Sequence, residues 1–226
     1  MSLYTISDLH LSLSTDKPMD IFYGWDNYLQ QLKSNWQRIV KPEDTVIIPG
    51  DLSWAMKLED SLEDFKFLDA LPGKKIILKG NHDLWWSSMK KLNEFFHKNG
   101  IKTVTALFNN HIECEGKAIC GSRGWYPSEA TDDKKIILRE AGRLKTSISS
   151  AKKAGLEPIV FMHYPPVTAD SVCRELIDVL KEEKINLVYH GHIHGAGLNN
   201  AVKSYDGIEF KLVSCDCIDF CPFLIV

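Results

Sequence analysis

Residues 75–86 of the chain read KIILKGNHDLWW. Its first five residues, 75–79, are rich in isoleucine and leucine, which is typical of a short strand buried inside a sheet. The chain then changes abruptly to GNHD, a tetrapeptide that suits neither a strand nor the interior of a helix. An apolar strand therefore ends at a polar cluster, and two tryptophans follow it.

The same change from apolar strand to polar cluster occurs five times along the chain. The other four strand-like runs are LYTIS before DLH, TVIIP before GD, EPIVFM before HYPP and INLVY before HGHIH. Segments with helical spacing of apolar residues occur at 25–40, 59–71, 87–98, 134–153 and 171–183. Alternating strands and helices predict an α/β fold, in which loops at the carboxyl ends of strands meet. The five clusters are therefore expected to converge.

The converging side chains are nitrogen and oxygen donors without a thiolate. They are Asp8, His10, Asp51, Asn81, His82, Asp83, His163, His190, His192 and His194. Such a set suits Mn, Fe, Zn or Ni better than Ca or Mg, which prefer all-oxygen shells. It is too large for one ion but suits two ions that share a carboxylate. Two cations about 3.5–4 Å apart can clamp both oxygens of a phosphoryl displacement and lower the pKa of a bound water.

As a set, these motifs resemble the calcineurin-like metallophosphoesterase family. DLH at 8–10, GD at 50–51, GNHD at 80–83, His163 and GHIH at 191–194 match in identity, order and approximate spacing. The resemblance implies a four-layer α/β/β/α sandwich with a dimetal site at its rim. The chain length is consistent with a single domain over residues 1–226.

The resemblance also implies a role for each residue. One metal ion would be held by Asp8, His10 and His194, the other by Asn81, His163 and His192, with Asp51 as the bridge. His82 would not bind metal; it would protonate the leaving oxygen or stabilise charge on the phosphoryl group. Asp83 would orient the ring of His82. The implied reaction is phosphoester hydrolysis by a metal-bound hydroxide.

An alternative from a different class is a protein-interaction scaffold, because some relatives with this fold have lost catalysis. A scaffold should have eroded ligand positions, whereas every expected position is filled here, which favours an enzyme. No DNA-binding cap or basic face is evident, so the expected substrate is a small phosphodiester or phosphomonoester. A nucleotide would suit if the tryptophans stack on a base.

Several residues near the motifs are candidates for substrate contact. These are Trp85, Trp86, Arg123 and Trp125. For the two adjacent tryptophans packing is an equal alternative, with one ring inside and one outside. Arg123 could pair with a substrate phosphate, but a solvated loop arginine is the favoured interpretation. Packing is favoured for Trp54. His190 is expected beside the ligands rather than among them. Cys215, Cys217 and Cys221 lack the spacing of a zinc site, and we expect buried, reduced thiols.

Composition limits the remaining possibilities. The 226 residues include 27 basic and 30 acidic side chains, for a net charge of −3, so no extended nucleic-acid surface is expected. The sequence shows no signal peptide and no apolar run long enough to cross a bilayer. Six cysteines in a chain of this length do not indicate a disulfide scaffold. These features predict a cytoplasmic protein without membrane contact, and they leave the oligomeric state open.

Overall fold

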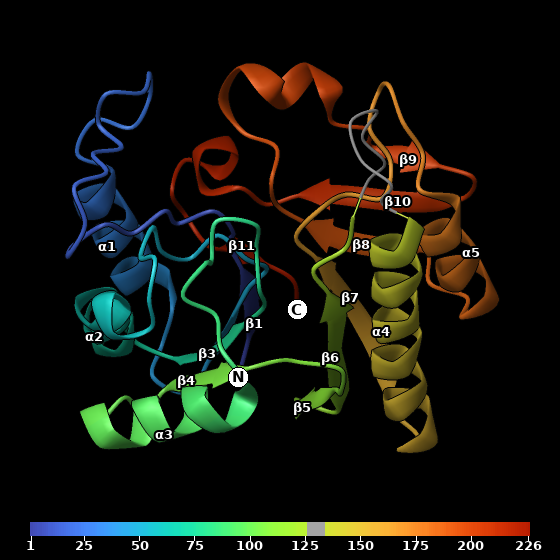
Figure 1. Cartoon of the computed structure of the whole chain (residues 1–226), viewed down its shortest axis with the longest axis horizontal. Helices are drawn as coiled ribbons and strands as arrows, with labels where there is room; N and C mark the ends of the chain where they lie inside the picture. The colour runs from blue at the N-terminus through green and yellow to red at the C-terminus, as the bar shows by residue number, and fades with distance from the viewer. Residues whose placement is uncertain (126–133) are drawn as a thin grey trace.

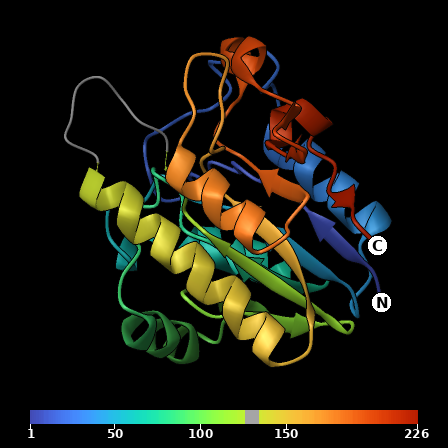
Figure 2. The ribbon, with the colours of Figure 1, turned by 90° about the vertical axis from the view of Figure 1, so that its right-hand side faces the viewer.

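The structure, a computed structural model, describes residues 1–125 and 134–226. Two β-sheets face each other, and helices cover the outer face of each (Figure 1). Seen after a 90° turn, α4 and α5 lie across the near face of the second sheet (Figure 2). The predicted four-layer α/β/β/α sandwich is confirmed.

The first sheet has five strands in the order β11-β1-β2-β3-β4. Strands β1 to β4 run parallel, and β11 is antiparallel to β1. Three helices, α1 to α3, bury their apolar faces against its outer side. The elements are β1 (Leu3–Thr5), α1 (Tyr28–Ile39), β2 (Thr45–Ile48), α2 (Leu62–Ala70), β3 (Lys74–Ile77), α3 (Met89–Asn99), β4 (Val104–Ala106) and β11 (Phe223–Leu224).

The second sheet has six strands in the order β5-β6-β7-β8-β10-β9. Its central strands are parallel, and the hairpin partners β5 and β9 are antiparallel to their neighbours. Helices α4 and α5 cover it. The elements are β5 (Ile112–Cys114), β6 (Lys117–Ser122), α4 (Lys134–Lys153), β7 (Glu157–Met162), α5 (Arg174–Glu182), β8 (Leu187–His190), β9 (Ser204–Tyr205) and β10 (Ile208–Leu212). Short 3-10 helices occur at η1 (Glu59–Ser61), η2 (Gly195–Asn200) and η3 (Cys215–Ile218).

The core between the two sheets explains why the strands are apolar on both faces. The first sheet contributes Leu3, Ile47 and Ile76, and the second contributes Phe161 and Tyr189, all in one buried cluster. The outer faces of the same strands pack under helices. A strand buried on both sides has no solvent face to mark with polar residues, hence the continuous apolar runs.

Strand register brings the polar clusters to one edge. Ile48 at the end of β2 pairs with Ile77 at the end of β3, and Met162 pairs with His190 in the other sheet. Parallel neighbours that end at the same level deliver the residues that follow them to the same place.

No helix in the described parts of the chain is long and apolar enough to cross a membrane.

Candidate metal centre

The turns that follow the strands hold several predicted ligands in a left-handed backbone conformation. The φ angle is 58° at Asp8, 45° at His10, 51° at Asp51 and 70° at His192. For a non-glycine residue this backbone conformation costs on the order of 1–3 kcal/mol. Residues in such conformations occur preferentially at functional sites. The sharp turns aim these side chains across the edge of the sandwich instead of along the strands.

Two glycines allow the turns to approach each other. A Cβ atom at Gly80 would overlap the backbone nitrogen and carboxylate of Asp51. A Cβ atom at Gly191 would overlap Ser7 and the carboxylate of Asp8. Neither glycine has a positive φ, so close packing against an acidic residue explains its presence. The glycines of GNHD and GHIH therefore make room for predicted ligands.

Asp8, His10 and His194 form the first group, with donor atoms all within 4.8 Å of one another. The Asp8 carboxylate is fully buried and accepts hydrogen bonds from Ser214 Oγ at 2.9 Å and the His192 backbone nitrogen at 3.0 Å. Both ring nitrogens of His10 are buried without a hydrogen-bond partner among the described residues. An orphaned buried imidazole is costly unless it binds a ligand.

Asp51, His163 and His192 form the second group, again within 4.8 Å. The Asn81 side-chain oxygen lies 2.7 Å from His163 Nε2 and 2.9 Å from His192 Nδ1. His163 Nδ1 lies 3.1 Å from the Pro49 carbonyl, which can only accept, so Nδ1 carries the proton and Nε2 presents its lone pair. The Asn81 side-chain oxygen and Nε2 of His163 therefore face each other with lone pairs and no proton between them. A cation bound by both atoms would stabilise this arrangement.

Asp51 belongs to the second group and also faces the first. Its Oδ2 is 3.4 Å from Nε2 of His163 and 3.9 Å from Nε2 of His10. Its Oδ1 accepts the backbone N–H of His82 at 2.8 Å. One carboxylate oxygen thus reaches toward a histidine of each group, which is the placement that a bridging ligand requires.

The electrostatics of the centre also fit divalent cations. Burial raises the pKa of Asp8 and of Asp51 above the usual carboxyl range, and the neighbouring carboxylates raise that of Asp51 further. Burial and adjacent imidazoles lower the pKa of His10 and of His163. Among the described residues, no lysine or arginine forms an ion pair with either carboxylate. Neutral imidazoles and uncompensated buried carboxylates fit metal ions, which would supply the missing positive charge.

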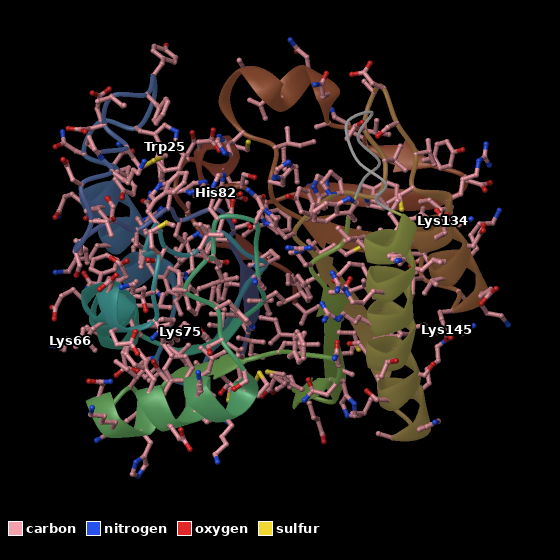
Figure 3. The ribbon with its side chains drawn as sticks, in the orientation of Figure 1. Trp25, Lys66, Lys75, His82, Lys134 and Lys145 are labelled. Carbon is pink, nitrogen blue, oxygen red and sulfur yellow. The ribbon has the colours of Figure 1, made fainter. Side chains whose placement is uncertain are left out.

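His82 lies at the rim of the centre. Its half-buried ring is 4.3 Å from that of Trp54 and 5.5 Å from that of His10. Trp25 and His82, both labelled in Figure 3, flank His10. Burial and the nearby His194 lower the pKa of His82, so its imidazole is neutral at pH 7. A neutral imidazole still donates one N–H hydrogen bond.

The predicted role of Asp83 as the residue that orients His82 is wrong. The buried Asp83 carboxylate accepts backbone N–H groups of Asp51 at 2.9 Å, Leu52 at 2.9 Å and Gly80 at 2.7 Å. It also accepts the indole N–H of Trp85 at 3.1 Å. A carboxylate has few lone pairs, and these donors occupy them. Asp83 instead ties the turn after β2 to the turn after β3.

The adjacent tryptophans divide into one inside and one partly outside. Trp85 is 2% exposed and packs edge-on against Phe65, 5.0 Å between ring centres, so its prediction as a substrate contact is wrong. Trp86 is half-buried against the same core, 5.4 Å from Trp85, and its contact with substrate stays a prediction. The bond to Asp83 explains why Trp85 turns inward.

Trp54, for which packing was the favoured expectation, packs against the core and also contacts a predicted ligand. Its partly exposed ring stacks on His10, with centres 4.8 Å apart and planes inclined by 22°. The signal available was its place three residues after Asp51, at a strand end. Tyr164, directly after His163, was missed by sequence reasoning, and its ring lies 4.3 Å from His192.

Arg123 and Trp125 lie beside the second group. The Arg123 carbonyl accepts the backbone N–H of Tyr164 at 2.8 Å, and its guanidinium lies 4.6 Å from the centre of the Trp125 ring. Their contact with substrate stays a prediction. Residues 126–133, which follow, lie outside the described residues.

The remaining candidates lie behind the centre. His190 is buried, belongs to neither group and places Nδ1 3.0 Å from the Gly191 carbonyl. Cys215 is buried and donates its thiol to the Asp8 carbonyl at 3.0 Å, whereas Cys217 and Cys221 are half-buried. All three are free thiols, and the predicted burial holds for Cys215 but not for Cys217 and Cys221.

Comparison with known proteins agrees with this architecture. Residues 1–196 match the family model described as Calcineurin-like phosphoesterase. No curated protein matches the chain. A solved protein of unknown function from Aquifex aeolicus is 22% identical with a TM-score of 0.57, covering 99% of this chain and 95% of its own. A phosphopantetheinyl hydrolase from Mycobacterium tuberculosis is 16% identical with a TM-score of 0.49, covering 94% and 88% respectively. The likeness to the Aquifex protein shows a shared fold.

Proposed function

Because the chain belongs to the calcineurin-like phosphoesterase family, we propose that it is a metal-dependent hydrolase of phosphoric esters with a dinuclear centre. The observation that carries this proposal is the convergence of seven predicted ligands from five strand ends. Within each of two groups the donor atoms lie within 4.8 Å of one another, and Asp51, a member of the second group, also reaches toward His10 of the first. This arrangement favours an enzyme over a scaffold, because a scaffold has no need to keep strained turns and orphaned imidazoles.

The chain would hold the two ions with the ligands that the family resemblance implies. One would be bound by Asp8, His10 and His194, the other by Asn81, His163 and His192, with Asp51 shared. When bound, two divalent cations supply positive charge to phosphoryl oxygens and lower the pKa of a nearby water. The nitrogen and oxygen donors suit Mn, Fe, Zn or Ni.

The other side chains around the centre have separate tasks. His82, neutral at pH 7 and at the rim, would donate its N–H to a phosphoryl oxygen or to the leaving oxygen. Asp83 keeps Asp51 in place through the backbone bonds of both turns. Trp54 and Trp25 cover the face of His10 and exclude water from it. The lowered pKa of His82 favours hydrogen bonding over full proton transfer.

The finer predictions concern substrate, metal and location. We propose a small phosphomonoester or phosphodiester as substrate, with nucleotides as one class to examine, and manganese as the first metal to test. A cytoplasmic location stays part of the proposal.

The experiment that tests this function combines metal content with hydrolysis. Purified protein is analysed for bound metals by mass spectrometry, and aryl phosphomonoester and phosphodiester hydrolysis is measured with Mn, Fe, Zn, Ni and Mg. We expect about two ions per chain and hydrolysis of at least one ester. Asp51→Ala should lose both bound metal and turnover, because it removes the shared carboxylate.

A matched control is Asp26→Ala, which removes a carboxylate from an exposed loop residue. It should keep metal content and turnover. Absence of hydrolysis with every metal, in protein that retains its ions, would contradict the enzyme proposal and favour the scaffold.

A further inference from the structure

A second feature of the same edge is a cavity beside the metal centre, between the first sheet and helix α4. Its volume is about 220 Å³. This is several times the roughly 30 Å³ that one water occupies in the liquid, so it has room for a phosphate and the atoms attached to it. The cavity opens where β3, β4 and β6 end, and α4 runs along the flank of β6 (Figure 1).

The lining of this cavity is strongly basic. Four cationic side chains line it: Lys79, Arg123, Arg139 and Arg143. The one carboxylate in the described lining is Glu140, which is fully buried and accepts Arg143 Nη1 at 2.7 Å. Four positive side chains and one negative side chain leave the lining with a net charge of about +3. The chain as a whole carries −3, so this concentration of positive charge is local.

Aromatic rings position two of the arginines, and of these Arg143 is also paired with Glu140. The Arg143 guanidinium lies 5.0 Å from the ring centre of Phe108, and that of Arg123 lies over Trp125. The Nε of Arg123 is buried without a hydrogen-bond partner among the described residues. A guanidinium group held against an aromatic ring can present its remaining N–H groups to a planar or tetrahedral oxyanion.

The cavity is next to the second metal-ligand group. Lys79 stands two residues before Asn81, roughly 7 Å along an extended backbone. Arg123 is joined by its carbonyl to Tyr164, the residue after His163. A ligand that places one phosphate at the metal centre could therefore place a second charged group in the cavity without leaving the protein surface.

We propose that this cavity binds a phosphate of the substrate that is not hydrolysed, so that the substrate is a phosphoester carrying a second phosphate. The proposal rests on the proposed function and narrows its substrate class. The guanidinium and ammonium groups of the cavity carry an excess of three positive charges. A phosphate with two negative charges is therefore a better match for the cavity than a carboxylate with one. The second phosphate would fix the substrate's orientation and would not react.

The first experiment measures binding independently of catalysis. Unfolding temperatures of the purified protein are compared in sodium phosphate and in sodium chloride of equal ionic strength. Arg139→Gln removes one cation from an exposed helix position where glutamine is a good helix former. Lys153→Gln is the control: it removes a charge from the same helix, fourteen residues or roughly 21 Å away. We expect phosphate to stabilise the wild type and Lys153→Gln, and to stabilise Arg139→Gln clearly less.

The second experiment links the cavity to the active centre by competition. Adenosine 5′-monophosphate and adenosine 3′,5′-bisphosphate are used as inhibitors of aryl phosphoester hydrolysis. The bisphosphate should bind about tenfold more tightly to the wild type, as expected for one charge-assisted contact. Arg139→Gln should lose most of this preference, and Lys153→Gln should keep it.

The outcomes separate the two proposals. If no aryl ester is hydrolysed, the proposed function fails, while the phosphate-dependent stabilisation still decides whether the cavity binds anions. If phosphate stabilises wild type and Arg139→Gln equally, binding lies elsewhere and the cavity proposal is overturned. It is also overturned if the bisphosphate has no advantage over the monophosphate on the wild type.

Discussion

His82 is the residue whose substitution tests the proposed chemistry most directly. Its ring makes no hydrogen bond to a predicted ligand, yet it lies beside both Trp54 and His10 at the rim of the centre. His82→Ala should keep its bound metal, because its backbone N–H still reaches Asp51. Turnover should fall by about a hundredfold or more, the usual cost of losing one donor to developing charge.

The readouts for this prediction are metal stoichiometry and kcat on an ester with a poor leaving group. His82→Gln should recover part of the loss, since its amide also donates an N–H. Full activity of His82→Ala on that ester would refute a role for the ring.

Lys75 allows a prediction about stability and pH at a distance from the metal centre. This lysine on β3, labelled in Figure 3, is fully buried. Its ammonium donates to the Leu71 carbonyl and to Thr103 Oγ1, the latter at 3.0 Å. Burial lowers its pKa from 10.5 to about 8. Between these values the unfolded chain holds a proton that the folded chain has released, so stability rises with pH in this window.

The comparison uses Lys75→Met, which has no proton to release. From pH 8 to pH 10.5 the wild type should gain about 3 kcal/mol in the free energy of unfolding relative to this variant. Chemical denaturation at several pH values measures it. Lys66→Met, at an exposed position on α2, is the control and should differ from the wild type by a constant amount. A constant difference for Lys75→Met as well would contradict the proton release.

At the scale of elements, the sequence predicted where strands end better than how the turns are built. Apolar runs mark β2, β3, β7 and β8 because each is buried on both faces, and a polar residue after the run marks its end. Nothing in the pattern states which way a side chain faces within a turn. Asp83 and Trp85 point inward because they bond each other and because Asp83 also bonds Asp51 of the neighbouring turn. Asp51 lies 32 residues before Asp83 in the chain, so no local pattern indicates this contact.

The turn after β3 gives a prediction in which a single methyl group disturbs the centre. In Gly80→Ala, the new Cβ would overlap Asp51, so either the turn shifts or Asp51 leaves its place. Metal affinity should fall by at least tenfold, and the free energy of unfolding by about 1–3 kcal/mol, as for overpacking. Equilibrium metal binding and denaturant unfolding measure the two effects.

Gly142 is the matched control. It lies within α4, and a Cβ there meets nothing within 4 Å. Gly142→Ala should leave metal binding unchanged and raise stability by roughly 0.5–1 kcal/mol through helix propensity. Equal metal affinities in Gly80→Ala and the wild type would show that the close approach does not position Asp51.

At the scale of the whole molecule, the candidate centre belongs to neither sheet alone. Asp8, Asp51 and Asn81 follow strands of the first sheet, and His163 and His192 follow strands of the second. The family resemblance predicted the ligands and a site at the rim of the sandwich, but not which sheet contributes each ligand. The cavity beside α4 could not be predicted, because Lys79, Arg123 and Arg143 come from three elements that only the packed sandwich brings together.

A centre shared by two sheets predicts that both sheets unfold together as a single domain. Five of the six tryptophans lie in residues 25–86, so fluorescence reports mainly on the first sheet and its helices, whereas circular dichroism reports on both. The two signals should give coincident unfolding transitions. Phe161 belongs to the second sheet but packs in the core between the sheets and is fully buried. Phe161→Ala should therefore destabilise the protein by about 3–5 kcal/mol and move both transitions equally. A fluorescence transition that stayed in place while the circular dichroism transition moved would mean that each sheet, with its helices, is an independent folding unit.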